Sequence, residues 1–148
     1  MNRAVRLEPL ADYAGKVETE AARRLATSAK ALAAKEKEVE QLRSYLAEYR
    51  QRAALADAAT DSLLWQNTRA FLTRLNAVVA AREAELAQIV ERYRLEVERW
   101  QDSYRRAKSL DKIVADGERE VAYEAAKREQ RELDERALLR MLERDDRP

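Results

Sequence analysis

Apolar residues recur every three or four positions along most of this chain, and the pattern breaks down once, near residue 60. Steps that alternate between three and four average about 3.5 residues, the period that keeps one narrow stripe of a helix facing a partner helix. Two such series therefore predict two long helices that pack along one seam. The first series is Leu7, Leu10, Ala14, Val17, Ala21, Leu25, Ser28, Leu32, Lys35, Val39, Leu42, Leu46 and Tyr49, and the second is Phe71, Leu75, Val79, Arg82, Leu86, Ile89, Tyr93, Val97, Trp100, Tyr104, Ala107 and Val114.

The composition agrees with long helices rather than with a globular domain. Charged residues make up 39% of the chain, and there are only two glycines and two prolines, a profile typical of coiled coils. The 29 basic and 28 acidic residues nearly cancel, so no net field attracts nucleic acid or anionic lipid. We expect an all-α protein that binds no nucleic acid.

Several kinds of chemistry are missing from the sequence. The chain has no cysteine and no histidine, which removes disulfides, the commonest general base and the commonest transition-metal ligand. Its two glycines, Gly15 and Gly117, cannot form a phosphate-binding loop. We expect no catalytic residues, no cofactor and no metal site. The uncharged runs are too short to cross a bilayer and the N-terminus lacks a signal-peptide core, which predicts a soluble cytoplasmic protein with no direct membrane insertion.

The break in the pattern predicts a hairpin within a single domain over residues 1–148. The first helix is expected over about 8–55, starting near Pro9, which the first turn of a helix tolerates. A turn is expected over about 56–62 and a second, longer helix over about 63–144. Because this region is rich in alanine, one continuous helix is the competing interpretation. A short turn makes the two helices antiparallel neighbours.

An approximate register follows if the turn centres near residue 59, with an uncertainty of one helical turn. Leu42 then faces the 75–79 region, and Lys35 faces Glu83, a residue of opposite charge. Trp100 and Tyr104 face the region of Gly15, where a notch without side chains would accommodate large rings. Residues after Ile113 have no partner within the hairpin.

Four residues of this unpaired end are candidates for docking to another protein. Leu138, Met141 and Leu142 share one helical face, and Leu133 precedes them. An unpaired apolar stripe can serve as a docking surface, although a frayed tail is an equally good interpretation.

A second candidate surface lies near the hairpin tip. Phe71, Leu75, Val78 and Arg82 have offsets of 0, 4, 7 and 11 residues, so they share one helical stripe. Packing in the seam is the alternative role for these residues. Phe71 and Leu72 are not expected to point inward together, and neither are Val78 and Val79, so one member of each pair should be available to a partner.

The order of several short motifs resembles the flagellar export protein FliJ family over nearly the whole chain. These motifs are RLEPL at 6–10, EAARRL at 20–25, YLAEYR at 45–50, WQNTRAFL at 65–72 followed by Leu75, Trp100 with Tyr104, and KREQRELDE at 127–135.

The resemblance implies a non-enzymatic component of the bacterial type III flagellar export apparatus, required for motility. Such proteins are antiparallel two-helix coiled coils similar to the stalk subunit of rotary ATPases. Their implied partners are the hexameric export ATPase, the cytoplasmic domain of the export-gate membrane protein, and export chaperones. The implied location is cytoplasmic, peripherally associated with the inner membrane at the flagellar base.

The resemblance also assigns the gate contact to the stripe at Phe71, Leu75, Val78 and Arg82. The last two depart from the alanine and histidine expected in an enteric relative. We predict that the tail residues Leu133, Leu138, Met141 and Leu142 engage the ATPase ring. Two other functions remain open on the residues alone: a generic coiled-coil scaffold or dimeric adaptor, and a helical-hairpin arm that binds nucleic acid.

Overall fold

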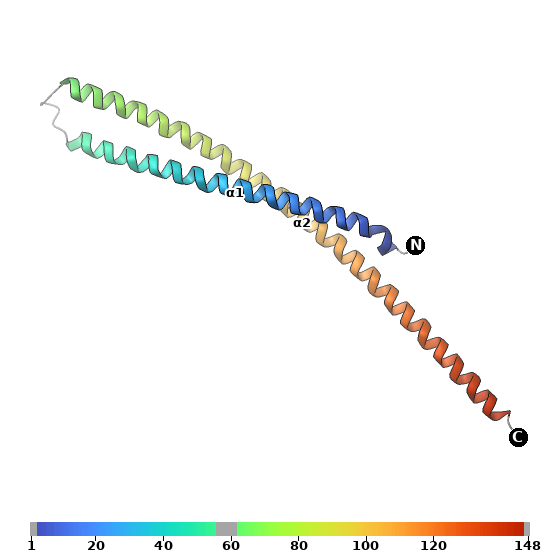
Figure 1. The fold of residues 1–148 in the computed structure, drawn as a ribbon. Coiled ribbons are helices and arrows are strands. Elements are labelled where there is room, and N and C mark those ends of the chain that lie inside the picture. The colour runs from blue at the N-terminus through green and yellow to red at the C-terminus, as the bar shows by residue number, and fades with distance from the viewer. Residues whose placement is uncertain (1–2, 56–61, 147–148) are drawn as a thin grey trace. The chain divides into compact units, whose positions relative to one another are not determined.

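The computed structural model describes residues 3–55 and 62–146, and these form two α-helices (Figure 1). Helix α1 spans Arg3–Leu55 and helix α2 spans Ser62–Asp145. The prediction of an all-α protein with two packed helices, the second one longer, is confirmed. The expected turn over 56–62 lies outside the described residues except for Ser62, the first residue of α2.

Helix α1 begins earlier than the sequence predicts. It starts at Arg3 instead of near residue 8, so Pro9 lies inside the helix and not in its first turn. A proline lacks the N–H that would bond to the carbonyl of Val5, four residues earlier. The cost is confined to one turn at the helix end, and the residues before Pro9 keep helical geometry.

Both helices contribute to two compact units. Unit 2 comprises Thr19–Asp102, and unit 1 comprises Met1–Glu18 with Ser103–Pro148. The assignment of one domain to residues 1–148 stays a prediction.

The core of unit 2 contains the apolar seam positions. Leu46, Leu75 and Val79 form a buried cluster, and Leu42 packs against it, which confirms the predicted meeting of Leu42 with the 75–79 region. Val39, also a seam position, is the most deeply buried large side chain at 1% exposed. Removing side chains of this size from water stabilises a fold by about 1.5–3 kcal/mol each. This strip is narrow, so each position in it matters.

Ion pairs across unit 2 establish that its helices are antiparallel. Lys35 Nζ donates a hydrogen bond to Glu85 Oε2 at 2.8 Å, and Arg43 Nε donates one to Glu83 Oε1 at 2.8 Å. As the position on α1 rises, its partner on α2 falls. The predicted pairing of Lys35 with Glu83 is wrong by two positions, because turn length sets the register and the heptad pattern does not specify turn length.

Unit 1 confirms part of the predicted seam, since Ala14 and Ala107 are buried, but it also buries Ala11, which is not one of the predicted seam positions. Ala11, Ala14 and Ala107 are its buried apolar residues. Small side chains at these positions let two helices approach closely, and the larger neighbours then lie beside the contact instead of within it. The predicted seam positions that prove to be exposed are Leu10, Val17 and Tyr104.

The predicted close approach of large rings at Gly15 is also wrong. A Cβ atom added to Gly15 meets no atom within 4 Å, and the residue has no positive φ. Neither packing nor backbone geometry requires glycine here.

Changing Gly15 to alanine is therefore expected to stabilise the protein. Alanine loses less backbone entropy than glycine in a helix, a gain of about 0.5–1 kcal/mol in the free energy of unfolding. Urea titration followed by circular dichroism measures this gain. A decrease in stability would mean that a neighbouring group packs too closely against Gly15 to accept a Cβ atom.

Candidate interaction surfaces

The residues predicted to bind partners all lie on α2, four in unit 2 and four in unit 1. Among residues 3–55 and 62–146, no group of three or more His, Cys, Asp or Glu side chains is placed to hold a metal ion. No helix in these ranges is long and apolar enough to span a membrane.

The structure divides the stripe near the hairpin tip into buried and exposed members. Leu75 is only 8% exposed and belongs to the core, and Phe71 is half-buried against that core. Val78 is 42% exposed, and the half-buried Arg82 reaches across to α1. Only Phe71, Val78 and Arg82 therefore present surface to a partner in the folded state.

We predicted that only one residue of each neighbouring pair, Phe71 with Leu72 and Val78 with Val79, points into the core, and the two pairs differ in outcome. Val79 is buried while Val78 is exposed, so that prediction is confirmed. The exclusion of Phe71 and Leu72 is wrong, because both are half-buried and both pack against the core. A groove between two helices accepts side chains on either side of the central stripe, so consecutive residues can share it.

An aromatic row that the sequence analysis missed lies beside this stripe. The ring centroids of Tyr45 and Tyr49 are 4.8 Å apart, and those of Tyr49 and Phe71 are 4.9 Å apart. Tyr45 is exposed, and the hydrogen bond between its hydroxyl and that of Tyr49, 3.3 Å long, raises the pKa of Tyr45. The spacing of Tyr45 and Tyr49, four residues apart, was the available signal. The row extends the apolar surface at Phe71 onto α1.

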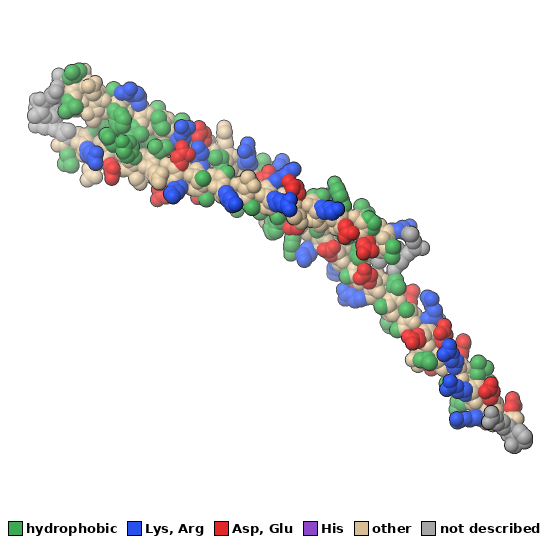
Figure 2. Space-filling model, in the orientation of Figure 1, with side chains coloured by type: hydrophobic (Ala, Val, Ile, Leu, Met, Phe, Trp, Pro, Cys, Tyr) green, Lys and Arg blue, Asp and Glu red, His purple; other side chains and the backbone are tan. Residues whose placement is uncertain are grey.

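The tail candidates are exposed, as the sequence predicts. Every residue from Glu118 to Asp146 is exposed, and we call this segment the overhang. Met141 and Leu142 follow Leu138 by three and four residues, so the three share a face, which we call the tail stripe. Leu133 precedes Leu138 by five residues and so lies about 140° away around the helix. Figure 2 shows acidic, basic and apolar side chains interleaved along this end of α2.

Comparison with known families decides which kind of protein carries these surfaces. The profile described as "Flagellar FliJ protein" matches residues 2–145. The chain belongs to the flagellar FliJ family. It is a non-catalytic component of flagellar type III export. No curated protein and no solved structure matches the chain.

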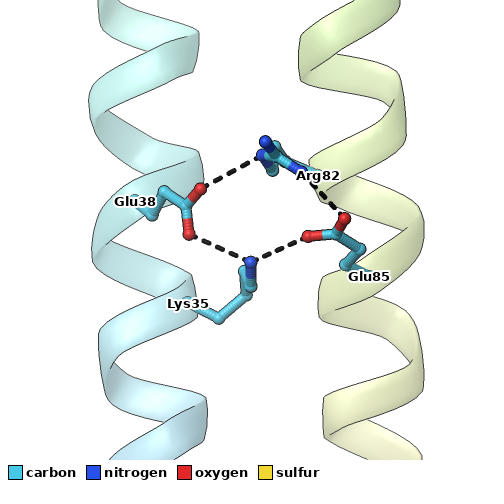
Figure 3. A network of polar contacts seen from close by, with 4 residues as sticks. All are labelled: Lys35, Glu38, Arg82 and Glu85. Atoms are coloured by element: carbon cyan, nitrogen blue, oxygen red, sulfur yellow. Dashed lines mark hydrogen bonds and ion pairs between the residues drawn. The ribbon is translucent and has the colours of Figure 1, made fainter.

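The helices of this FliJ-family chain are also joined by a four-residue polar layer in unit 2 (Figure 3). Lys35 lies between two carboxylates, 2.8 Å from Glu85 and 3.0 Å from Glu38. Arg82 closes the ring, 3.2 Å from Glu38 and 2.8 Å from Glu85. The Lys35 side chain is only 18% exposed, so it occupies a seam position. One charged layer between apolar layers favours the register in which its charges meet.

Each charge in the layer is stabilised by the opposite one. The hydrogen bond from Lys35 lowers the pKa of Glu85, and the hydrogen bonds to Glu85 and Glu38 raise the pKa of Lys35. A carboxylate whose pKa is lowered by folding adds stability at pH values above its pKa in the unfolded state. This stability is lost as the pH falls through its pKa in the folded state. The raised pKa of Lys35 extends the layer's contribution to alkaline pH.

The layer predicts how stability depends on pH in this FliJ-family chain. Glu85→Gln is expected to lower the melting temperature at neutral pH, and the difference from wild type should shrink below about pH 4.5, the ordinary value for glutamate. Melting curves followed by circular dichroism at several pH values measure that difference. Glu40→Gln, at an exposed position on α1, is the matched control and should show a small difference that varies little with pH. A Glu85→Gln difference that persisted in acid would show that the ion pair is not its cause.

Proposed function

We propose that this chain is the central stalk of the flagellar export ATPase and couples the ATPase ring to the export gate. In this proposal the overhang of α2 engages the hexameric ring and promotes its assembly and activity. The surface of unit 2 around Phe71 and Val78 contacts the cytoplasmic domain of the gate protein. Export chaperones are the third class of partner, and the site of action is the cytoplasmic face of the inner membrane at the flagellar base.

The exposed overhang is the observation that carries this proposal. An isolated helix gains little stability by itself, and most helices in proteins depend on packing of an apolar face. Here 29 consecutive helical or terminal residues, Glu118–Asp146, are exposed, with three apolar side chains gathered in the tail stripe. A helix that presents such anchors is suited to insertion into a groove or ring of another protein.

The proposed gate contact rests on the exposed members of the stripe formed by Phe71, Leu75, Val78 and Arg82, which we call the tip stripe. Phe71 and Val78 offer apolar surface, and the half-buried Arg82, paired with Glu38 and Glu85, lies at the edge. Aromatic side chains and arginine are enriched among residues that dominate binding energy. Tyr45 is added to this surface because the aromatic row joins it to Phe71.

Serine substitutions in the tail stripe test the ring contact. Leu138→Ser combined with Met141→Ser is expected to abolish stimulation of the export ATPase, because the change removes two apolar anchors from one face. The measurement is the ATP hydrolysis rate of the purified ATPase with each variant added.

A matched control separates the tail stripe from general loss of apolar surface. Leu139 is 59% exposed, nearly the same as Leu138 at 58%, but it lies outside the stripe. Leu139→Ser should therefore stimulate the ATPase as the wild type does. Equal stimulation by the Leu138/Met141 variant would refute the ring contact, and circular dichroism should show unchanged helicity in both variants.

A further inference from the structure

Unit 1 carries a series of α2 positions that borders the buried seam around Ala107 and shares its half-buried edge. Positions 106 to 145 follow steps of four and three without a break. Leu110 and Gly117 are half-buried in this series, and its other members are exposed. We call the series the outer ladder; its members are Arg106, Leu110, Ile113, Gly117, Glu120, Glu124, Lys127, Arg131, Asp134, Leu138, Met141 and Asp145. Seven of its twelve members are charged and four are apolar, with two apolar members towards each end. The face is exposed along most of its length, so a helix of complementary charge and apolar pattern can pack against it.

The outer ladder is complementary to its own reverse. Consider a second copy of the helix that runs antiparallel to the first, with both copies centred between Ala125 and Ala126. Each ladder position of one copy then lies opposite a ladder position of the other. The resulting pairs are Arg106 with Asp145, Leu110 with Met141, Ile113 with Leu138, Gly117 with Asp134, Glu120 with Arg131 and Glu124 with Lys127. Two pairs are apolar, three join opposite charges, and none joins like charges. Such a pattern fits an antiparallel, isologous pair of identical helices.

The central charges of the ladder are available for such a contact. Glu120, Glu124 and Arg131 are exposed and take part in none of the ion pairs within the described residues. Lys127 lies over the ring of Tyr123, 5.4 Å from its centroid. Within one helix, Glu120 and Arg131 are eleven residues apart, about 16 Å along the axis, so they cannot pair in the same chain.

A groove in unit 1 receives the end of the second copy. It has a volume of about 230 Å³, and apolar residues of α1, including Leu10, Tyr13 and Val17, line one side. Leu110 and Arg106 line the α2 side, and Arg106 is the only charged residue of the lining. The reversed ladder brings Met141 and Asp145 of the second copy to this groove, an apolar side chain beside Leu110 and a carboxylate beside Arg106.

The same chain cannot fill its own groove. Helix α2 is continuous from Ser62 to Asp145, and Met141 lies 31 residues beyond Leu110, about 46 Å along the axis. A continuous helix cannot fold back onto its own surface. The occupant with matching chemistry is therefore a second copy of the chain.

We propose that two copies of this protein associate through the outer ladders, antiparallel, with the end of each α2 seated in the unit 1 groove of the other. The four central charges, Glu120, Glu124, Lys127 and Arg131, specify the antiparallel register. These central residues lie outside the tail stripe, so the self-association can be tested separately from the proposed ring contact.

Two charge-reversed variants test the proposal. Variant one carries Glu120→Arg and Glu124→Lys, and variant two carries Lys127→Glu and Arg131→Glu. In a pair of identical copies each variant sets like charges opposite one another. In a mixture of the two variants every central pair again joins opposite charges. Sedimentation velocity from micromolar to sub-millimolar concentration measures the mass, and circular dichroism checks that helicity is retained.

The wild type is expected to rise from 17.1 kDa towards twice that mass as concentration increases. Each variant alone should dissociate at least about tenfold more readily, because attraction is replaced by repulsion at four sites. The equimolar mixture should recover the doubled mass, which no effect on a single folded chain can produce. A wild type that stays at 17.1 kDa, variants that dimerise as the wild type does, or a mixture that stays monomeric would each overturn the proposal.

Discussion

Replacing Val79 by aspartate is expected to disrupt the packing of unit 2, whereas the same change at Val78 leaves it folded. Val79 is 5% exposed within the core cluster, and its neighbour Val78 is 42% exposed. A carboxylate at Val79 would have to lose its hydration or take up a proton. An uncompensated buried charge costs about 3–5 kcal/mol, a large share of the stability of an ordinary domain.

Thermal melting followed by circular dichroism measures this contrast. Val79→Asp should lower the melting temperature by about 10 °C or more, while Val78→Asp should change it by no more than a few degrees. The two variants have the same composition and differ by one step along α2, so net charge and helix propensity are matched. Equal destabilisation by both variants would show that the helices of unit 2 pack on a different face.

The heptad spacing was sufficient to predict the core of unit 2. Val39, Leu42 and Leu46 were placed on the α1 side of the seam, and Leu75 and Val79 on the α2 side, and all five are buried or half-buried. In this stretch each seam residue is flanked mainly by charged, polar or small residues, so only one face of each helix is apolar enough to pack.

The same spacing succeeded only in part in unit 1. It placed Ala14 and Ala107 in the seam correctly, but it failed where neighbouring positions compete. Leu10 is followed by Ala11, and the structure buries the alanine and exposes the leucine. The apolar pattern favours the larger residue, but a close approach of two helices favours the smaller one. Periodicity counts apolar positions without their volumes, so it cannot choose between adjacent candidates.

Cross-helix partners were predicted less well than buried positions. Lys35 was recognised as a seam position that needs an acidic partner, and the structure supplies Glu85 with Glu38. Glu83 pairs with Arg43 instead. A long lysine side chain reaches several positions on the facing helix, so charge complementarity alone leaves the register open by about one turn. The four-residue ring with Arg82 depends on that register and could not be derived from the pattern.

The interaction surfaces illustrate a further limit of sequence patterns. The apolar residues of the tip stripe share one helical face, yet Leu75 lies in the core and Val78 is at the surface. A helix packed against a single partner buries only a narrow stripe. Leu75 and Val78 are about 60° apart around the helix, and this small difference decides which side chain is in the core and which is available to a partner. The contact role proposed for the stripe can therefore apply only to its exposed members.

This division predicts that binding to the export gate and folding respond to different residues of the stripe. Val78→Asp is expected to weaken binding to the cytoplasmic domain of the gate by at least about tenfold, because a charge replaces apolar contact surface at the centre of the proposed site. It should leave the melting temperature nearly unchanged. Titration calorimetry with the purified gate domain measures the affinity.

Leu75→Ala is the counterpart within the core. Removing a buried leucine side chain is expected to lower the free energy of unfolding by about 2–4 kcal/mol, since the cavity adds to the lost transfer free energy. At a temperature where the variant is still folded, its affinity for the gate domain should stay close to that of the wild type. Loss of gate binding by folded Leu75→Ala, with normal binding by Val78→Asp, would contradict the proposed contact surface. That result would mean that the gate recognises an opened form of unit 2, in which Leu75 has left the core and its side chain is the anchor.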